Sequence, residues 1–170
     1  DARSITPVKV RGLGNMEVAD LIALWIDKTK PDAVCIDAGN GTGVIDRLRQ
    51  MKYRVHEVWF GSKSSSKEWA NKRTEMYADA RDWLGGGCID GDNLLFRDLT
   101  APEYDYFGKA KDAVMLESKE SMKGRIGASP DDGDAFVLTF AVKVARRDYG
   151  KALHSNRSRV ASGVDYKVFG

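Results

Sequence analysis

Apolar and polar positions define one clear unit near the start of the chain, AVCIDAGNGTGVIDRL. Its apolar run Ala33–Ile36 predicts a strand that is buried on both faces. Asp37 follows directly, then a glycine-rich segment that predicts a turn, Gly39–Gly43, and then an amphipathic helix that buries Val44, Ile45 and Leu48. This order places a carboxylate at the carboxyl end of an interior strand, where open α/β folds bind ligands.

The remaining pattern predicts an alternation of strands and helices. Period-two spacing predicts strands at 3–11, 53–60, 104–107 and 113–116, and period-3.6 spacing predicts helices at 16–28, 67–84 and 135–146. Residues 93–99 fit either a helix or a strand, whereas 61–66 predict a flexible serine-rich loop and 117–125 a charged loop or extended segment. Ser129 and Pro130 predict the start of the last helix. The order implies an α/β protein with a mostly parallel or mixed sheet between helices.

Composition indicates the general class of protein but predicts no activity. The 170 residues predict one domain, 1–150, followed by a basic tail, 151–170, that we expect to be loosely held or bound to a partner. The net charge of +2 gives no strong overall field toward nucleic acid. Two cysteines in dissimilar settings favour a reducing compartment. Neither a membrane span nor a signal-like start is seen, so we expect a soluble cytoplasmic protein without a membrane partner.

Asp37 is the first candidate for chemistry. It interrupts an apolar run, and a buried carboxylate needs a partner because desolvation of its charge is costly. One interpretation is a metal ligand or an acid/base group at the strand end. The alternative is an Asx bond from this side chain to the following backbone.

A second acidic group, Asp131, Asp132 and Asp134, opens the last predicted helix. Acids in a first turn complement the helix dipole, which alone could explain one or two of them. Asp131 and Asp134 are spaced i, i+3, so we expect them on one face. If this helix packs near the Asp37 strand, oxygen ligands converge, which suits Mg²⁺ or Mn²⁺ and allows a pair of ions to bind a phosphodiester.

The glycines Gly39, Gly41 and Gly43 leave two other interpretations open. They could cradle a phosphate at a helix N-terminus, which keeps a Rossmann-type nucleotide binder as a weaker alternative. The spacing is neither G-x-G-x-x-G nor a P-loop, and a tight turn that lets the strand and helix pack is at least as good an explanation.

Basic side chains gather in two places along the chain. Lys63, Lys67, Lys72 and Arg73 border the serine-rich loop, and Lys119, Lys123 and Arg125 precede the acidic group. Such residues are commonly only solvated surface. Beside an acidic metal site they are also what binding to a phosphate backbone requires, so we predict that these seven contact DNA.

Three separated motifs, within residues 35–64, 71–84 and 99–141, resemble the C-terminal nuclease domain of tailed-bacteriophage large terminases. The resemblance covers about residues 10–145 and is nearest to the headful-packaging podovirus branch. It implies an RNase H-like fold with a central mixed sheet flanked by helices on both faces. It also implies a nuclease that uses two Mg²⁺ or Mn²⁺ ions to cut concatemeric double-stranded viral DNA in the host cytoplasm. Portal protein and the small terminase subunit are the implied partners, through the full-length chain.

The resemblance assigns roles by position. Asp37 matches the acid that ends a key strand, and the Ser-Pro-Asp-x-x-Asp-Ala pattern matches Ser129–Ala135, so Asp131 and Asp134 are the implied acids and metal ligands. The adjacent Asp132 remains a further metal ligand candidate. The family's first catalytic Asp lies on an opening strand whose motif is not seen around Asp1, so we expect weak or absent cleavage by this chain alone. No Walker A motif of the packaging ATPase is seen either.

The leading hypothesis is therefore a metal-dependent endonuclease domain that cuts with little sequence specificity, because backbone contacts position DNA without reading its bases. The alternative is an RNase H-like module that binds DNA or portal protein without cutting.

Overall fold

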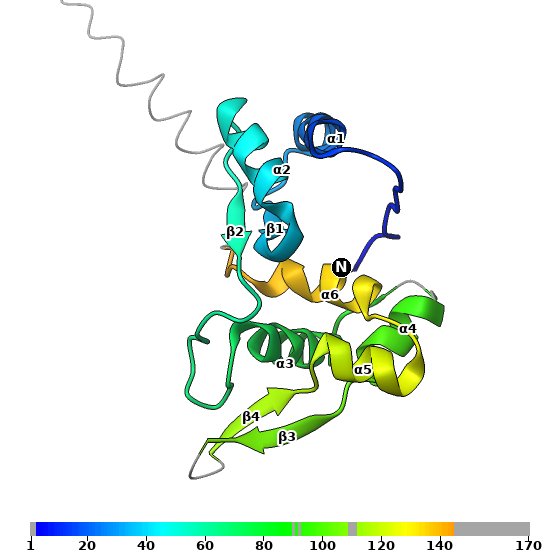
Figure 1. The fold of residues 1–170 in the computed structure, drawn as a ribbon. Helices are drawn as coiled ribbons and strands as arrows, with labels where there is room; N and C mark the ends of the chain where they lie inside the picture. The colour runs from blue at the N-terminus through cyan, green and yellow to red at the C-terminus, as the bar shows by residue number, and fades with distance from the viewer. Residues whose placement is uncertain (1–2, 90, 92, 109–111, 145–170) are drawn as a thin grey trace, which may run out of the picture.

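The computed structural model describes residues 3–89, 91, 93–108 and 112–144. Within these residues the order of elements is α1 Asn15–Thr29, β1 Cys35–Asp37, α2 Ala38–Gln50, β2 His56–Val58, α3 Lys72–Leu84, α4 Asn93–Thr100, β3 Tyr104–Phe107, β4 Ala113–Leu116, α5 Lys119–Ile126 and α6 Asp131–Val137. A 3₁₀ turn, Leu138–Phe140, follows α6. The predicted mixture of strands and helices is confirmed, and α6 runs between the β1–β2 unit and α3 (Figure 1).

The first unit contains the predicted strand before Asp37, but β1 is half-buried in a two-stranded sheet and is not an interior strand buried on both faces. β1 pairs in parallel with β2, with Asp37 opposite Val58. Helix α2 begins directly after β1 and packs against α1, where Ala19, Ala23 and Leu48 form a buried cluster. Because β1 ends where α2 starts, the Asp37 carboxylate lies at the junction of the two elements.

The second unit contains helices α3–α6 and an antiparallel hairpin. The two strands predicted at 104–107 and 113–116 are confirmed, and β3 pairs with β4 in the register Tyr104 to Leu116. The main core cluster joins Val58 of β2 to Met76 of α3 and Val137 of α6. This shared core brings the last helix to the sheet that carries Asp37.

The structure does not reproduce the expected central sheet. Its described residues contain two separate two-stranded sheets rather than one mixed sheet with helices on both faces. The predicted strand at 3–11 is wrong, because only Arg3 forms a bridge, to Cys88, while Ile5 and Val8 remain exposed. In this segment an alternating pattern has no strand partner and so forms no ladder.

The glycine segment is helical, so the prediction of a turn at 39–43 is wrong. Asp37 caps α2, and the glycines allow close packing instead. A Cβ on Gly41 would lie 2.8 Å from the Ile36 side chain, and a Cβ on Gly43 would overlap Asn15 of α1. The packing role was therefore anticipated, although the backbone conformation was not.

Several further boundaries differ from the prediction: α3 begins at Lys72 in place of Lys67, and β2 covers 56–58 in place of 53–60. Residues 117–125 were expected as a loop or extended segment but contain most of α5, which Ser118 caps by accepting a hydrogen bond from the Ser121 amide at 3.1 Å. Helix α6 begins at Asp131 with Pro130 as its N-cap residue, in place of the predicted Ser129 cap. The predicted tail at 151–170 lies outside the described residues. No helix in the described part is long and apolar enough to cross a membrane.

Candidate metal centre

The two carboxylate oxygens of Asp37 make different contacts. Oδ1 accepts a hydrogen bond from the Gly39 amide at 2.9 Å, so the Asx bond that was the alternative interpretation of Asp37 is present. Oδ2 faces the Nζ atom of Lys119 at 3.8 Å, and the side chain remains 35% exposed. The hydrogen bond to Oδ1 fixes the orientation of the carboxylate and leaves Oδ2 directed toward Lys119.

Asp134 lies in the first turn of α6 with its side chain only 7% exposed. Its Oδ1 accepts hydrogen bonds from Arg73 Nε and from the Tyr77 hydroxyl, both at 3.0 Å. Its buried Oδ2 lies 2.9 Å from Lys119 Nζ but accepts no hydrogen bond from any described residue. This oxygen is therefore balanced by charge alone, which is a costly state for a buried carboxylate.

Lys119 joins the two acids. Its ammonium lies within ion-pair distance of both Asp37 and Asp134, which are 97 positions apart in the sequence. It also lies 4.8 Å from the centre of the Phe60 ring. The predicted meeting of the strand-end acid with an acid of the last helix is therefore observed, with a lysine between them.

Arg73 and Tyr77 of α3 bind the other oxygen of Asp134, Oδ1. The Arg73 Nη1 atom donates to the Glu117 carbonyl at 2.7 Å, and its guanidinium stacks 5.0 Å from the Tyr77 ring centre. Burial raises the pKa of Tyr77, and the nearby Asp134 charge raises it further. Tyr77 therefore remains protonated and donates to Asp134 at any working pH.

The other two acids of α6 are directed elsewhere. Asp131 is exposed and accepts a hydrogen bond from the Ser129 hydroxyl at 2.7 Å. Asp132 pairs with Lys9 of the N-terminal segment at 2.5 Å. Within the described residues no group of three or more His, Cys, Asp or Glu side chains is placed to hold a metal ion. The structure brings Asp37 and Asp134 together, and the wider ligand set with Asp131 and Asp132 stays a prediction.

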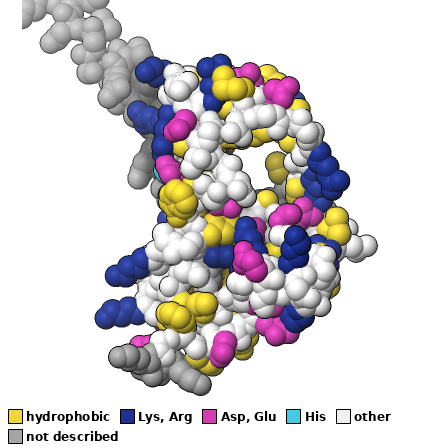
Figure 2. Space-filling model, viewed as in Figure 1, with side chains coloured by type: hydrophobic (Ala, Val, Ile, Leu, Met, Phe, Trp, Pro, Cys, Tyr) yellow, Lys and Arg dark blue, Asp and Glu magenta, His cyan; other side chains and the backbone are white. Residues whose placement is uncertain are grey.

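The seven predicted DNA-binding residues fall into two groups. Lys63, Lys67 and Lys123 are exposed, and Figure 2 shows basic side chains projecting beside the loop between β2 and α3. The others are in ion pairs: Lys72 with Glu75, Lys119 with Asp37 and Asp134, Arg73 with Asp134, and Arg125 with Glu103 and Glu117. Arg73 is buried, so its assignment to DNA is corrected: it holds Asp134.

The serine-rich loop is anchored rather than flexible, which also corrects the prediction. The buried Glu75 accepts hydrogen bonds from the Ser65 amide at 2.8 Å and the Ser65 hydroxyl at 2.5 Å. Burial opposes ionisation of Glu75, but these bonds and Lys72 together lower its pKa. Lys63 and Lys67 are consequently presented by a loop of fixed shape.

Sequence reasoning missed the role of Lys119 at the acids, the Arg73–Tyr77 pair and the buried Asp98 of α4. Asp98 follows Leu95 at helical spacing, so an acid on the apolar face of 93–99 was a usable signal. No comparable pattern marked Lys119, because its segment is charged throughout.

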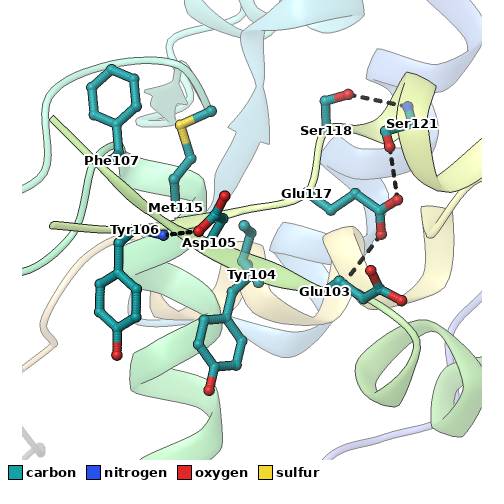
Figure 3. A pocket seen from close by; sticks show the side chains of 10 residues that line it. Glu103, Tyr104, Asp105, Tyr106, Phe107, Met115, Glu117, Ser118 and Ser121 are labelled. Atoms are coloured by element: carbon teal, nitrogen blue, oxygen red, sulfur yellow. Dashed lines mark hydrogen bonds between the residues drawn. The ribbon is translucent and has the colours of Figure 1, made fainter. Parts of the chain in front are cut away.

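A separate cavity of about 530 Å³ lies beside the hairpin (Figure 3). Asp105, Phe107 and Met115 line it together with Glu117, which accepts a hydrogen bond from the Ser121 hydroxyl at 2.8 Å. Neither Asp37 nor Asp134 lines this cavity, so it is distinct from the acid pair.

Comparison with solved structures gives the fold. The chain is similar to the nuclease domain of the large terminase subunit gp2 of bacterial virus Sf6, with a TM-score of 0.55, 19% identity, and coverage of 76% of this chain and 73% of that one. A mutant of that domain with manganese has the same TM-score, 21% identity, and coverage of 72% and 71%. A mutant with calcium gives a TM-score of 0.55 and 21% identity over 72% and 70%. This chain has the fold of a terminase nuclease domain.

The likeness to terminase nuclease domains confirms the resemblance noted in the sequence. No family model and no curated protein matches the chain. The fold assignment therefore rests on the arrangement of elements, and the chemistry must be argued from this chain's own residues.

Proposed function

We propose that the chain is the nuclease domain of a phage packaging terminase, and that it hydrolyses double-stranded DNA with a divalent metal ion held by Asp37 and Asp134. The observation that carries this proposal is that both carboxylates lie within ion-pair distance of one nitrogen, Lys119 Nζ. Two acids from distant parts of the sequence converge around a single cation. Such convergence is the minimum that a shared metal ion requires.

The donor set fits Mg²⁺ or Mn²⁺. Both ions prefer oxygen ligands, and Mg²⁺ is commonly bound by one or two carboxylates together with waters and substrate phosphates. The buried Oδ2 of Asp134 accepts no hydrogen bond from the described residues. Oδ2 of Asp37 and Oδ2 of Asp134 are both directed toward the Lys119 ammonium. The second ion that the sequence suggested needs further ligands and remains part of the proposal.

The protein groups divide the work at this site. Asp37 and Asp134 would bind the metal ion, and Arg73 and Tyr77 hold Oδ1 of Asp134 while its Oδ2 faces Lys119. Without a metal ion, Lys119 reduces the repulsion between the two acids. A bound divalent ion supplies charge stabilisation at the phosphodiester and lowers the pKa of a bound water.

Backbone contacts complete the proposal. The exposed Lys63, Lys67 and Lys123 are suited to hold phosphate groups, which position DNA but do not read its sequence. Cutting with little sequence specificity follows. We also propose, from the terminase assignment, that the partners are portal protein and the small terminase subunit. The proposed location is the host cytoplasm.

The decisive experiment measures Mn²⁺ binding and cutting together. We expect Mn²⁺ to raise the melting temperature of the chain and to support slow plasmid cleavage, because a ligand that binds only the native state stabilises it. Asp37→Ala and Asp134→Ala should lose both effects. Asp46→Ala, an exposed acid of α2, is the matched control and should retain both. Equal cutting by wild type and Asp37→Ala would remove Asp37 from the mechanism.

The same measurements separate the alternatives. Salt-dependent DNA binding without any Mn²⁺ effect on melting supports the non-cutting module that binds DNA or portal protein. A melting shift with nucleotide and none with metal supports the nucleotide binder that the glycine segment suggested.

A further inference from the structure

Asp98, near the end of α4, is a buried acid that contacts the start of α6. Its residue surface is only 1% exposed. Oδ2 accepts hydrogen bonds from the backbone amides of Asp132 at 3.0 Å and Gly133 at 3.3 Å. Oδ1 accepts from Arg97, through Nε at 2.9 Å and Nη2 at 2.5 Å. The carboxylate is therefore satisfied on both oxygens despite its burial.

These contacts give α6 a cap that comes from another helix. The first amides of a helix have no partner inside it, and Pro130 at the N-cap position supplies no side-chain bond. Asp98 accepts from two of these amides, and its charge also complements the helix dipole. The start of α6 is consequently fixed to α4 rather than by its own flanking sequence.

Close packing reinforces the cap. A Cβ on Gly133 would lie 2.9 Å from the Asp98 Cβ and 3.0 Å from the Tyr77 hydroxyl oxygen. The same hydroxyl donates to Asp134, the residue that follows Gly133. Asp98, Gly133 and Tyr77 thus meet at one point, and Asp134 projects from it toward Lys119.

We infer that Asp98 is a positioning residue for the candidate metal centre, and that it sets the place of the Asp134 carboxylate through the first turn of α6. The inference rests on the proposed function, because it concerns a metal ion bound by Asp134. Asp98 itself makes no contact with Asp37 or Lys119 among the interactions of the described residues. Groups that orient a metal ligand typically change metal affinity about 10–100-fold when they are removed.

The test is a calorimetric Mn²⁺ titration of the whole chain, well below its melting temperature. Asp98→Ala should weaken Mn²⁺ binding about 10–100-fold. Asp98→Asn should weaken it less, because the amide oxygen can still accept from the α6 amides. Asp82→Ala is the matched control: Asp82 accepts from Arg81 through the same two nitrogen atoms but is exposed, and its loss should leave the affinity unchanged.

A second variant protects the test against misfolding of Asp98→Ala. Gly133→Ala keeps the Asp98 carboxylate but pushes α6 away from it, so it should weaken Mn²⁺ binding in the same direction. A purely structural role predicts lower melting temperatures with unchanged Mn²⁺ affinity in every folded variant, and that result overturns the inference. Absence of Mn²⁺ binding by wild type overturns the proposed metal site as well. If wild type and the Asp98 and Gly133 variants bind Mn²⁺ with equal affinity, only the positioning role is overturned.

Discussion

Lys119 Nζ lies 2.9 Å from Asp134 Oδ2 at the point where the Asp37 carboxylate also approaches. A lysine ammonium thus stands between two acids that would otherwise repel each other. It provides a positive charge at the position where the proposed function requires a metal ion. Removal of the amine should therefore destabilise the metal-free chain and at the same time leave this position open to the ion.

Replacing Lys119 with methionine should make the chain less stable without metal and more responsive to Mn²⁺. Loss of the ammonium leaves Oδ2 of the buried Asp134 without its ion-pair partner, with an expected cost of about 1–2 kcal/mol because Lys119 itself is partly exposed. Thermal melting with and without Mn²⁺ measures both effects. Lys123→Met, an exposed lysine on the same helix, is the control and should change neither. A smaller Mn²⁺ shift in Lys119→Met than in wild type would contradict this prediction.

Replacing Arg73 with methionine should lower the free energy of unfolding strongly. Arg73 is buried and pairs with Asp134, and removing one partner of a buried pair typically costs about 3–5 kcal/mol. Arg81 lies on the same helix but is exposed and pairs with the exposed Asp82. Arg81→Met should cost less than about 1 kcal/mol. Urea unfolding of the two variants provides the comparison, and similar losses would show that Arg73 has no special role in holding Asp134.

Asp37 and Asp134 could be predicted from the sequence because each lies beside a strong local pattern. Asp37 ends an apolar run, and Asp134 lies in the first turn of a helix that begins after Ser129-Pro130. Each signal depends on neighbours within a few residues. The shared apolar core then brings the two elements together, as amphipathic patterning leads one to expect.

Lys119 and α5 were not accessible in the same way. Met122 is the one buried residue in α5, so the helix has almost no apolar stripe from which a period could be read. The segment 3–11 failed for the opposite reason. Its alternation is clear, but a strand exists only where a neighbour completes the ladder, and this depends on residues far away in sequence.

Replacing Glu75 with alanine should release the serine-rich loop. The buried Glu75 carboxylate holds both the amide and the hydroxyl of Ser65, so its loss leaves the loop without its main anchor. Trypsin should then cut after Lys63 and Lys67 faster than in wild type, since cleavage follows local opening. Glu68→Ala, an exposed acid of the same loop, should not accelerate cleavage. Equal cleavage rates for both variants would mean that other contacts fix the loop.

Removing the exposed lysines of this loop should weaken DNA binding in a salt-dependent manner. If Lys63 and Lys67 each hold one phosphate, the double alanine variant should reduce the slope of log affinity against log salt by about 2. Fluorescence anisotropy with duplex DNA over a range of salt concentrations measures the slope. Lys28→Ala on α1 is the control, because Lys28 lies beside the Trp25 ring and outside the loop. An unchanged slope in the double variant would remove both lysines from the DNA contact.

Glu117 should make the stability of the chain depend on pH under acidic conditions. Hydrogen bonds from Arg125 lower the pKa of Glu117 to about 2, from an ordinary value of 4.5. A carboxylate whose pKa is depressed in the native state adds stability above its unfolded pKa and loses it as pH falls toward the folded value. Unfolding free energy should therefore fall between about pH 4.5 and pH 2. Glu117→Gln should flatten this part of the profile, whereas Glu120→Gln, an exposed acid of α5, should leave it unchanged. Urea titrations at several pH values measure both profiles, and a slope in Glu117→Gln equal to that of wild type would assign the acid sensitivity to other carboxylates.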